Sequence, residues 1–281
     1  MLEALTRLHY KAFDVKLFDK WNNRFKKLED VFGRVDEYAS LESQFATNQK
    51  ITGEAIKYCT VNKENYLSKC NMRLSEKDWL GNKMLSFGRG LKALGLFYDK
   101  HYVNGLRIAL IREVDNVSSF TLKTDYQFTE IEAQVHEIRR KLRWFSIYVQ
   151  ALCGLIQVKE SGKRKKYEVG YFTKEIIDSP FNKIAPKPAD MEVIEFDRDS
   201  FLALNWLINE LGKLKDSVLT MYQLRDAVFV TENVTKEEAT QKALKALGLK
   251  STAEEDALKK ASDLIRAFMA KDKMLDNLIV R

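Results

Sequence analysis

The chain has 281 residues, of which 45% are hydrophobic and 31% are charged, a composition typical of globular proteins with a packed core. No apolar run approaches the roughly 18 residues of a membrane span. The amino-terminal segment MLEALTRLHYKAFDVKLF lacks the uninterrupted apolar stretch of a signal peptide. We therefore expect a cytoplasmic protein of one large or two small domains, without membrane contact.

The formal net charge of +7 is unevenly distributed along the chain. Residues 189–281 hold 14 basic and 17 acidic side chains, whereas residues 1–188 hold 33 basic and 23 acidic ones. Residues 133–170 alone hold nine basic and three acidic side chains. A concentrated positive region attracts anionic partners, although most such regions are only solvated surface.

The elements predicted before the first proline are amphipathic helices. The first runs from about Leu5 to Phe32, and the pair Thr129 and Glu132 forms a T-x-x-E capping box just before a later helix. That later helix begins near Val135 and ends near Gln157. The helices between them cover about 36–47, 51–70, 76–100 and 105–121.

All three prolines lie between Pro180 and Pro188, and they mark an irregular connection over about 159–198. Within it, the weak alternation of Tyr167–Phe172 indicates a short hairpin. Capping patterns then predict helices over about 201–230, 236–247 and 253–279. The sequence therefore predicts an all-α multi-helix bundle. Its parts are an N-terminal bundle (1–158), the connection (159–198) and C-terminal helices that pack on the first part (199–281). If the chain arose by duplication, the N-terminal and C-terminal helical parts are two related halves.

The helix from Val135 to Leu152 carries two opposed stripes at helical spacing. One is apolar and is suited to burial. The other is cationic, with Ser146 and Gln150 extending it, and its basic members are His136, Arg139, Arg140 and Arg143. Arginine is the side chain best suited to phosphate, because its planar fork donates parallel hydrogen bonds and stays charged. The stripe therefore favours anion binding.

The alternative is that acidic side chains of neighbouring helices neutralise these arginines. Glu137 lies elsewhere on the same helix, so we expect it to be a poor partner for the cluster. Close to three arginines, His136 should have a lowered pKa and should act as a hydrogen-bonding group. A basic run follows the helix, and it consists of Lys163, Arg164, Lys165 and Lys166. It either extends the same anion-binding surface or forms a solvated loop.

No enzyme motif stands out in the sequence. The three histidines have no metal-ligand spacing, and neither a phosphate-cradling Gly-Lys-Ser/Thr loop nor a G-x-S-x-G motif is present. We expect no cofactor, no metal site and no catalysis. Three cysteines, Cys59, Cys70 and Cys153, follow no pairing motif and are expected to be reduced thiols in or near the core.

The spacing H-x-x-R-x-x-x-R at His136, Arg139 and Arg143 resembles the signature of CHAD domains, the conserved-histidine α-helical domains. That resemblance implies a helical bundle of two related halves around a basic channel that binds inorganic polyphosphate, with these three side chains and Arg140 lining it. In the second half, Asn205–Lys215 is the nearest counterpart. Only Lys215 falls on a matching basic position there, with Lys213 close by.

The leading functional hypothesis is non-catalytic binding of inorganic polyphosphate or a similar polyanion through the basic helix face. The expected binding residues are His136, Arg139, Arg140, Arg143, Gln150, Lys163, Arg164, Lys165, Lys166, Lys213 and Lys215. The alternative is a helical scaffold whose basic surface meets an acidic protein. A third hypothesis is non-specific nucleic-acid binding.

Overall fold

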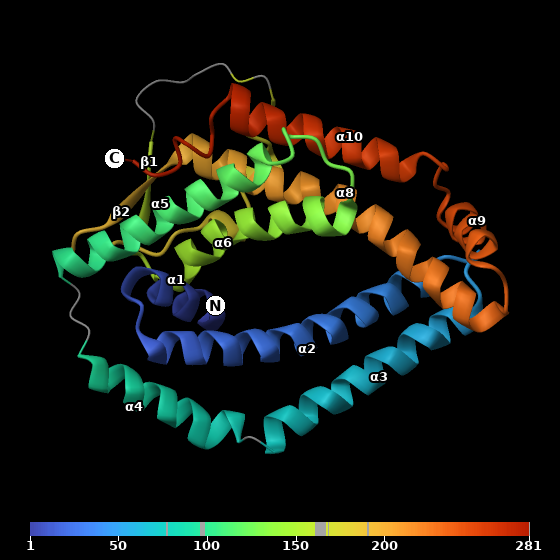
Figure 1. Cartoon of the computed structure of the whole chain (residues 1–281), viewed down its shortest axis with the longest axis horizontal. Helices are drawn as coiled ribbons and strands as arrows, with labels where there is room; N and C mark the ends of the chain where they lie inside the picture. Colours follow the sequence, from blue (N-terminus) through green and yellow to red (C-terminus); the bar gives the residue numbers. More distant parts are fainter. Residues whose placement is uncertain (77, 96–98, 161–166, 168, 190, 281) are drawn as a thin grey trace. The chain divides into compact units, whose positions relative to one another are not determined.

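A computed structural model of the chain describes residues 1–76, 78–95, 99–160, 167, 169–189 and 191–280. Helices dominate these residues, and the all-α prediction is confirmed (Figure 1). The α-helices are α1 (Leu2–Phe13), α2 (Lys16–Ala46), α3 (Gly53–Glu76), α4 (Met84–Leu94), α5 (Lys100–Leu122), α6 (Glu137–Ala151), α7 (Lys174–Ile177), α8 (Arg198–Glu232), α9 (Lys236–Leu247) and α10 (Ala253–Arg266). Short π-helical turns are η1 (Trp79–Lys83), η2 (Ile131–His136) and η4 (Ala267–Lys271), and η3 (Pro180–Asn182) is a 3₁₀ turn. Within the described part of the chain, no helix is both long enough and apolar enough to cross a bilayer.

The chain forms two compact units, and each is assembled from separated segments. The first unit contains residues 1–22, 96–215 and 255–281, and the second contains residues 23–95 and 216–254. The boundaries of these units differ from the predicted division, which was placed at the prolines. The reason is that α2 and α8 each contribute residues to both units, so the divisions fall inside long helices.

The core of the first unit forms where α1, α5 and α6 pack on one another (Figure 1). Its fully buried side chains include Leu8, Leu106, Leu142 and Phe145. The predicted first helix is interrupted at Asp14, which adopts a left-handed conformation with φ 51° and ends α1. Asp tolerates this conformation better than most residues, so one residue turns a predicted continuous helix into two.

A short parallel pair of strands lies in the first unit. Strand β1 (Ile156–Lys159) pairs with β2 (Ile194–Asp197), with Ile156 opposite Ile194. The C-terminal segment extends this pairing through an antiparallel bridge between Phe196 and Ile279. The described residues of Tyr167–Phe172 form no strand, so the predicted hairpin is replaced by strands on either side of it.

The second unit has its own aromatic core. The ring of Phe25 lies 5.9 Å from that of Trp79 and 5.4 Å from that of Phe87. The predicted helix 236–247 is α9, and its capping box is confirmed. Thr235 Oγ accepts a hydrogen bond from the Glu238 amide at 3.2 Å, while the Glu238 carboxylate accepts one from the Thr235 amide at 2.9 Å.

Candidate functional site

The basic helix begins as the π turn η2 and continues as α6. Its start is stabilised by Gln134, whose side-chain oxygen accepts hydrogen bonds from the amides of Thr129 at 2.6 Å and Glu130 at 3.1 Å. This arrangement replaces the predicted capping box of Thr129 and Glu132. The helix also ends earlier than predicted, at Ala151, and Cys153 just beyond it adopts a left-handed conformation with φ 46°. Gln157 belongs to β1.

The predicted apolar stripe of this helix is confirmed. Its members are almost completely buried, and they are Val135, Ile138, Leu142, Phe145, Val149 and Leu152. Burying the whole stripe fixes the rotation of α6 about its own axis. The cationic residues are therefore held on a defined side of the helix.

Arg139 lies against α8. Its Nε donates a hydrogen bond to the backbone carbonyl of Ile208 at 3.0 Å. The side chain passes over Gly212, where a Cβ would come within 3.0 Å of Nε. The lack of a side chain at 212 therefore gives the arginine its place between the two helices.

Lys215 of α8 is close enough to His136 to lower the pKa of that imidazole. Burial is the first cause of the lowered pKa, followed by the positive charges of Lys215, Arg139 and Arg140, and Glu132 opposes them. The predicted direction of this shift is confirmed. The buried Nδ1 of His136 has no hydrogen-bond partner among the described residues, and such an atom is costly unless a ligand or solvent satisfies it. His136, Arg139 and Lys215 thus form one cationic cluster from two helices.

Glu137 contacts the arginine stripe, contrary to the prediction that it would be a poor partner. Its carboxylate lies 2.7 Å from the Arg140 guanidinium and 3.3 Å from the Lys141 ammonium. The i,i+3 and i,i+4 spacings bring these side chains together on the helix surface. Arg143, by contrast, is exposed and has no ion-pair partner within the described residues.

The other predicted binding residues have different surroundings. Gln150 donates hydrogen bonds to the backbone carbonyls of Phe181 at 3.0 Å and Lys183 at 3.1 Å, so its amide already ties the connection to α6. Lys213 is exposed and pairs with Glu210 at 2.7 Å. Residues 163–166, the basic run, lie outside the described residues.

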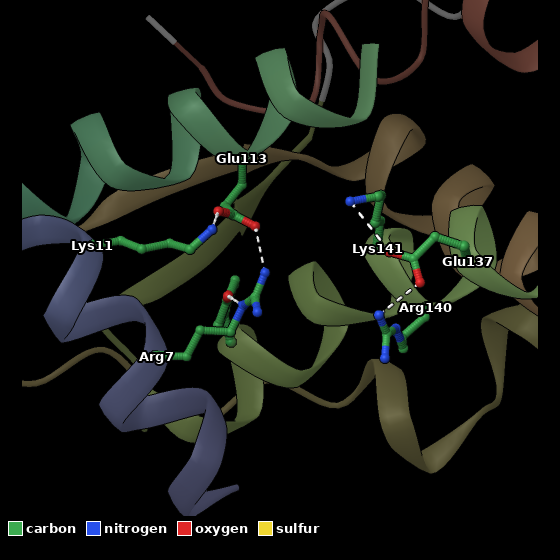
Figure 2. A network of polar contacts seen from close by, with 7 residues as sticks. Arg7, Lys11, Glu113, Glu137, Arg140 and Lys141 are labelled. Carbon is green, nitrogen blue, oxygen red and sulfur yellow. Dashed lines mark hydrogen bonds and ion pairs between the residues drawn. The ribbon is translucent and has the colours of Figure 1, made fainter. Parts of the chain in front are cut away.

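A second charged cluster lies between α1, α5 and α6, and sequence reasoning missed it. Figure 2 shows Arg7 and Lys11 of α1 pointing toward Glu113 of α5. Arg7 approaches one carboxylate oxygen at 3.3 Å, and Lys11 donates to the other. The Arg7 Nε also donates to the hydroxyl of Tyr148 at 3.0 Å. The residues are about a hundred positions apart in sequence, so no local pattern signals their meeting.

A pocket of about 260 Å³ opens beside this cluster. Lys141 of α6, which pairs with Glu137 (Figure 2), also lines this pocket. The lining residues are Arg7, Lys11, Glu113, Asn116, Val117, Ser119, Phe120, Lys123 and Lys141. Four cations and one carboxylate therefore border a single cavity.

The donor sets at both places suit anions. Within the described residues, no group of three or more His, Cys, Asp or Glu side chains is arranged to hold a metal ion. Comparison with known proteins adds no further constraint on function, since no family model, no curated protein and no solved structure matches this chain.

Proposed function

We propose that the chain binds a phosphate-rich polyanion, such as inorganic polyphosphate, without transforming it. The binding surface consists of His136, Arg139, Arg140 and Arg143 on the η2–α6 helix together with Lys215 of α8. The single observation that carries the proposal is the meeting of His136, Arg139 and Lys215 across two helices. A single amphipathic helix cannot bring together basic side chains from two separate segments of the chain.

The positive charges of the cluster lie close enough to act on one another. Lys215, Arg139 and Arg140 each lower the pKa of His136, after burial as the first cause, while Glu132 opposes them. Like charges held together repel one another, and a bound polyanion relieves that repulsion. Glu137 offsets part of the charge of Arg140.

Arg143 supplies the most accessible contact of this surface. It lies one helical turn beyond Arg139 and is exposed, so it can pair with a phosphate without breaking an existing ion pair. Neighbouring phosphates of a flexible chain can then reach Arg139 and Lys215. An anion with several linked phosphates gains from all these contacts at once, which a single phosphate cannot do.

Calorimetric titration with inorganic polyphosphate tests the proposal. Affinity should fall as salt rises, because bound cations on the polymer are released on binding. Arg143→Gln should weaken binding about tenfold at about 0.05 M salt, since one phosphate contact contributes a salt slope of roughly 0.7. Arg112→Gln, which removes an exposed arginine on α5, is the matched control and should leave affinity unchanged.

Competition experiments separate the rival functions. A random oligonucleotide that displaces polyphosphate at equal phosphate concentration would favour nucleic-acid binding. An acidic protein that is retained from lysate after treatment with nuclease and polyphosphatase would favour the scaffold. Equal polyphosphate affinity of the wild-type protein and Arg143→Gln would refute the proposed surface.

A further inference from the structure

We infer that the pocket between α1, α5 and α6 is a separate binding site for a compact anion that carries a phosphate group. This inference does not depend on polyphosphate binding at the α6–α8 surface. The two places use different residues of α6, because Lys141 borders the pocket whereas Arg139 contacts α8.

The charge of the pocket favours an anion. Arg7, Lys11, Lys123 and Lys141 border it, and Glu113 is the one acidic residue of the lining. The lining therefore keeps an excess of three positive charges. Solvent screens such charges less inside a cavity than on an open surface.

Glu113 fixes two of these cations in position. Its side chain is 7% exposed and is shared between Arg7 and Lys11. A buried carboxylate needs such partners, so the two basic side chains are held in place before any ligand arrives. Arg7 is held further by the Tyr148 hydroxyl and by stacking 4.8 Å from the centre of the Trp144 ring. Preorganised donors lose less conformational entropy on binding.

The remaining two cations supply charge for a ligand. Lys123 follows the end of α5, is exposed, and has no ion-pair partner within the described residues. Lys141 is shared between Glu137 at 3.3 Å and the face of Phe120 at 5.3 Å. An anion can thus contact Lys123 without displacing a carboxylate of the protein.

The size and the remaining walls define the class of ligand. A volume of about 260 Å³ is below the range of roughly 300–1,000 Å³ that is typical for drug-sized molecules. Asn116 and Ser119 offer polar groups for phosphate oxygens, and Val117 and Phe120 offer apolar contact. Free phosphate or a small phosphomonoester fits this description, whereas a long polymer does not.

Titration of the purified chain with inorganic phosphate and with glycerol 3-phosphate tests the inference. Lys123→Gln should weaken binding of both ligands about tenfold, because a charge-assisted hydrogen bond is lost. Lys187→Gln, an exposed lysine in the connection, is the matched control and should have no effect. Thermal unfolding of each variant verifies that the fold is retained.

The outcomes are distinct from those for the polyanion surface. Arg143→Gln should keep its affinity for both small ligands, while Lys123→Gln should keep its affinity for polyphosphate. Tighter binding of glycerol 3-phosphate than of phosphate would assign the apolar wall to an organic group, and the reverse order would assign the site to the free ion. The inference is overturned if the wild-type protein binds neither ligand, or if Lys123→Gln binds them as the wild type does.

Discussion

Arg139 and Gly212 lie against each other across α6 and α8, with space for the guanidinium because residue 212 has no side chain. A Cβ added at 212 would lie 3.0 Å from Nε and 3.2 Å from Nη2 of Arg139. These contacts are closer than ordinary packing, so a larger residue requires the arginine to shift by a few tenths of an ångström. Gly212 is thus the residue that leaves space for a cation of the opposite helix.

The Gly212→Ala substitution should therefore have two opposing effects on the free energy of unfolding. Alanine stabilises a helix interior by about 1 kcal/mol relative to glycine, while the shift of Arg139 weakens its hydrogen bond to Ile208, which is worth about 1 kcal/mol. We expect a net change of less than about 0.5 kcal/mol in the wild-type background. In an Arg139→Ala background, the same substitution should stabilise the protein by about 1 kcal/mol.

Denaturant unfolding of the four proteins in this cycle measures the coupling. Gly88→Ala on α4, where a Cβ meets nothing within 4 Å, serves as the control and should stabilise both backgrounds equally. The same increment for Gly212→Ala in both backgrounds would contradict the proposed contact.

Polyphosphate affinity should rise as pH falls from about 7.5 to about 5.5, across the ordinary titration range of histidine. The pKa of His136 is lowered by burial and by Lys215, Arg139 and Arg140. A bound polyanion offsets those charges and raises this pKa, so binding takes up a proton. Because a lowered folded-state pKa disfavours protonation, the contribution of His136 to the stability of the free protein is present above about pH 6.5 and declines below it.

Calorimetry at both pH values should show severalfold tighter binding at the lower one. His136→Gln should remove this difference between the two pH values. Protonation of the polyphosphate itself affects the wild type and the variant equally, so comparing the two proteins isolates the effect of His136. A pH dependence that persists unchanged in His136→Gln would assign the proton to another group.

Glu137→Gln should raise the affinity of both proposed sites. Its carboxylate offsets the positive charge of Arg140, which belongs to the polyanion surface, and that of Lys141, which lines the pocket (Figure 2). Removing that charge frees both cations, while the loss of two short-range helix pairs costs only about 0.5 kcal/mol each. Titrations with polyphosphate and with phosphate measure the gain. Glu195→Gln, which breaks the exposed pair with Lys159, should change neither affinity.

Glu113→Gln should lower the free energy of unfolding by about 2–3 kcal/mol, because a buried ion pair loses its carboxylate and leaves Arg7 and Lys11 uncompensated. The Arg7 guanidinium stays charged after the substitution, because arginine is always protonated in proteins at neutral pH. Glu175→Gln, at an exposed carboxylate 3.9 Å from Lys213, should change stability by less than about 0.5 kcal/mol. Chemical denaturation compares the two, and equal effects would contradict an anchoring role for Glu113.

Cys153 should react with iodoacetamide at least about 100-fold faster than Cys59 at neutral pH. The expectation that all three thiols lie in or near the core holds for Cys59 and Cys70 but is wrong for Cys153, which is exposed. Burial raises the pKa of Cys59 to about 11 and also raises that of Cys70, so few thiolates are present there. Mass spectrometry of the folded protein should find rapid labelling at one position, and equal labelling in denaturant is the control.

The sequence predicts those features that depend on local periodicity. The apolar stripe of α6 was identifiable because buried residues of a helix repeat at 3.6 positions, and the box at Thr235 because capping uses adjacent residues. The break at Asp14 depends on a single backbone angle, which no pattern signals. Strand pairing of Ile156 with Ile194 spans the connection, so local alternation around Tyr167 was a poor guide to it.

The residues of the candidate sites also fall into those placed by local helix geometry and those placed by packing between helices. His136 and Arg139 share one face because of helix geometry, and the sequence suffices to place them together. Lys215 was predicted only through the CHAD resemblance, because its place beside His136 depends on the contact of α8 with α6. The pocket was not predictable, since Arg7 meets Glu113 and Tyr148 only after three separate helices have packed.

The first unit is built from three separated stretches of chain, and the last of them is residues 255–281. Ser262 accepts a hydrogen bond from the Phe128 amide at 2.9 Å, and Asp272 accepts one from the Tyr171 hydroxyl at 2.7 Å. During synthesis, these contacts cannot form until residues 255–281 have left the ribosome. The helices that carry both basic clusters lack these contacts until then, whereas residues 23–95 of the second unit leave the ribosome much earlier.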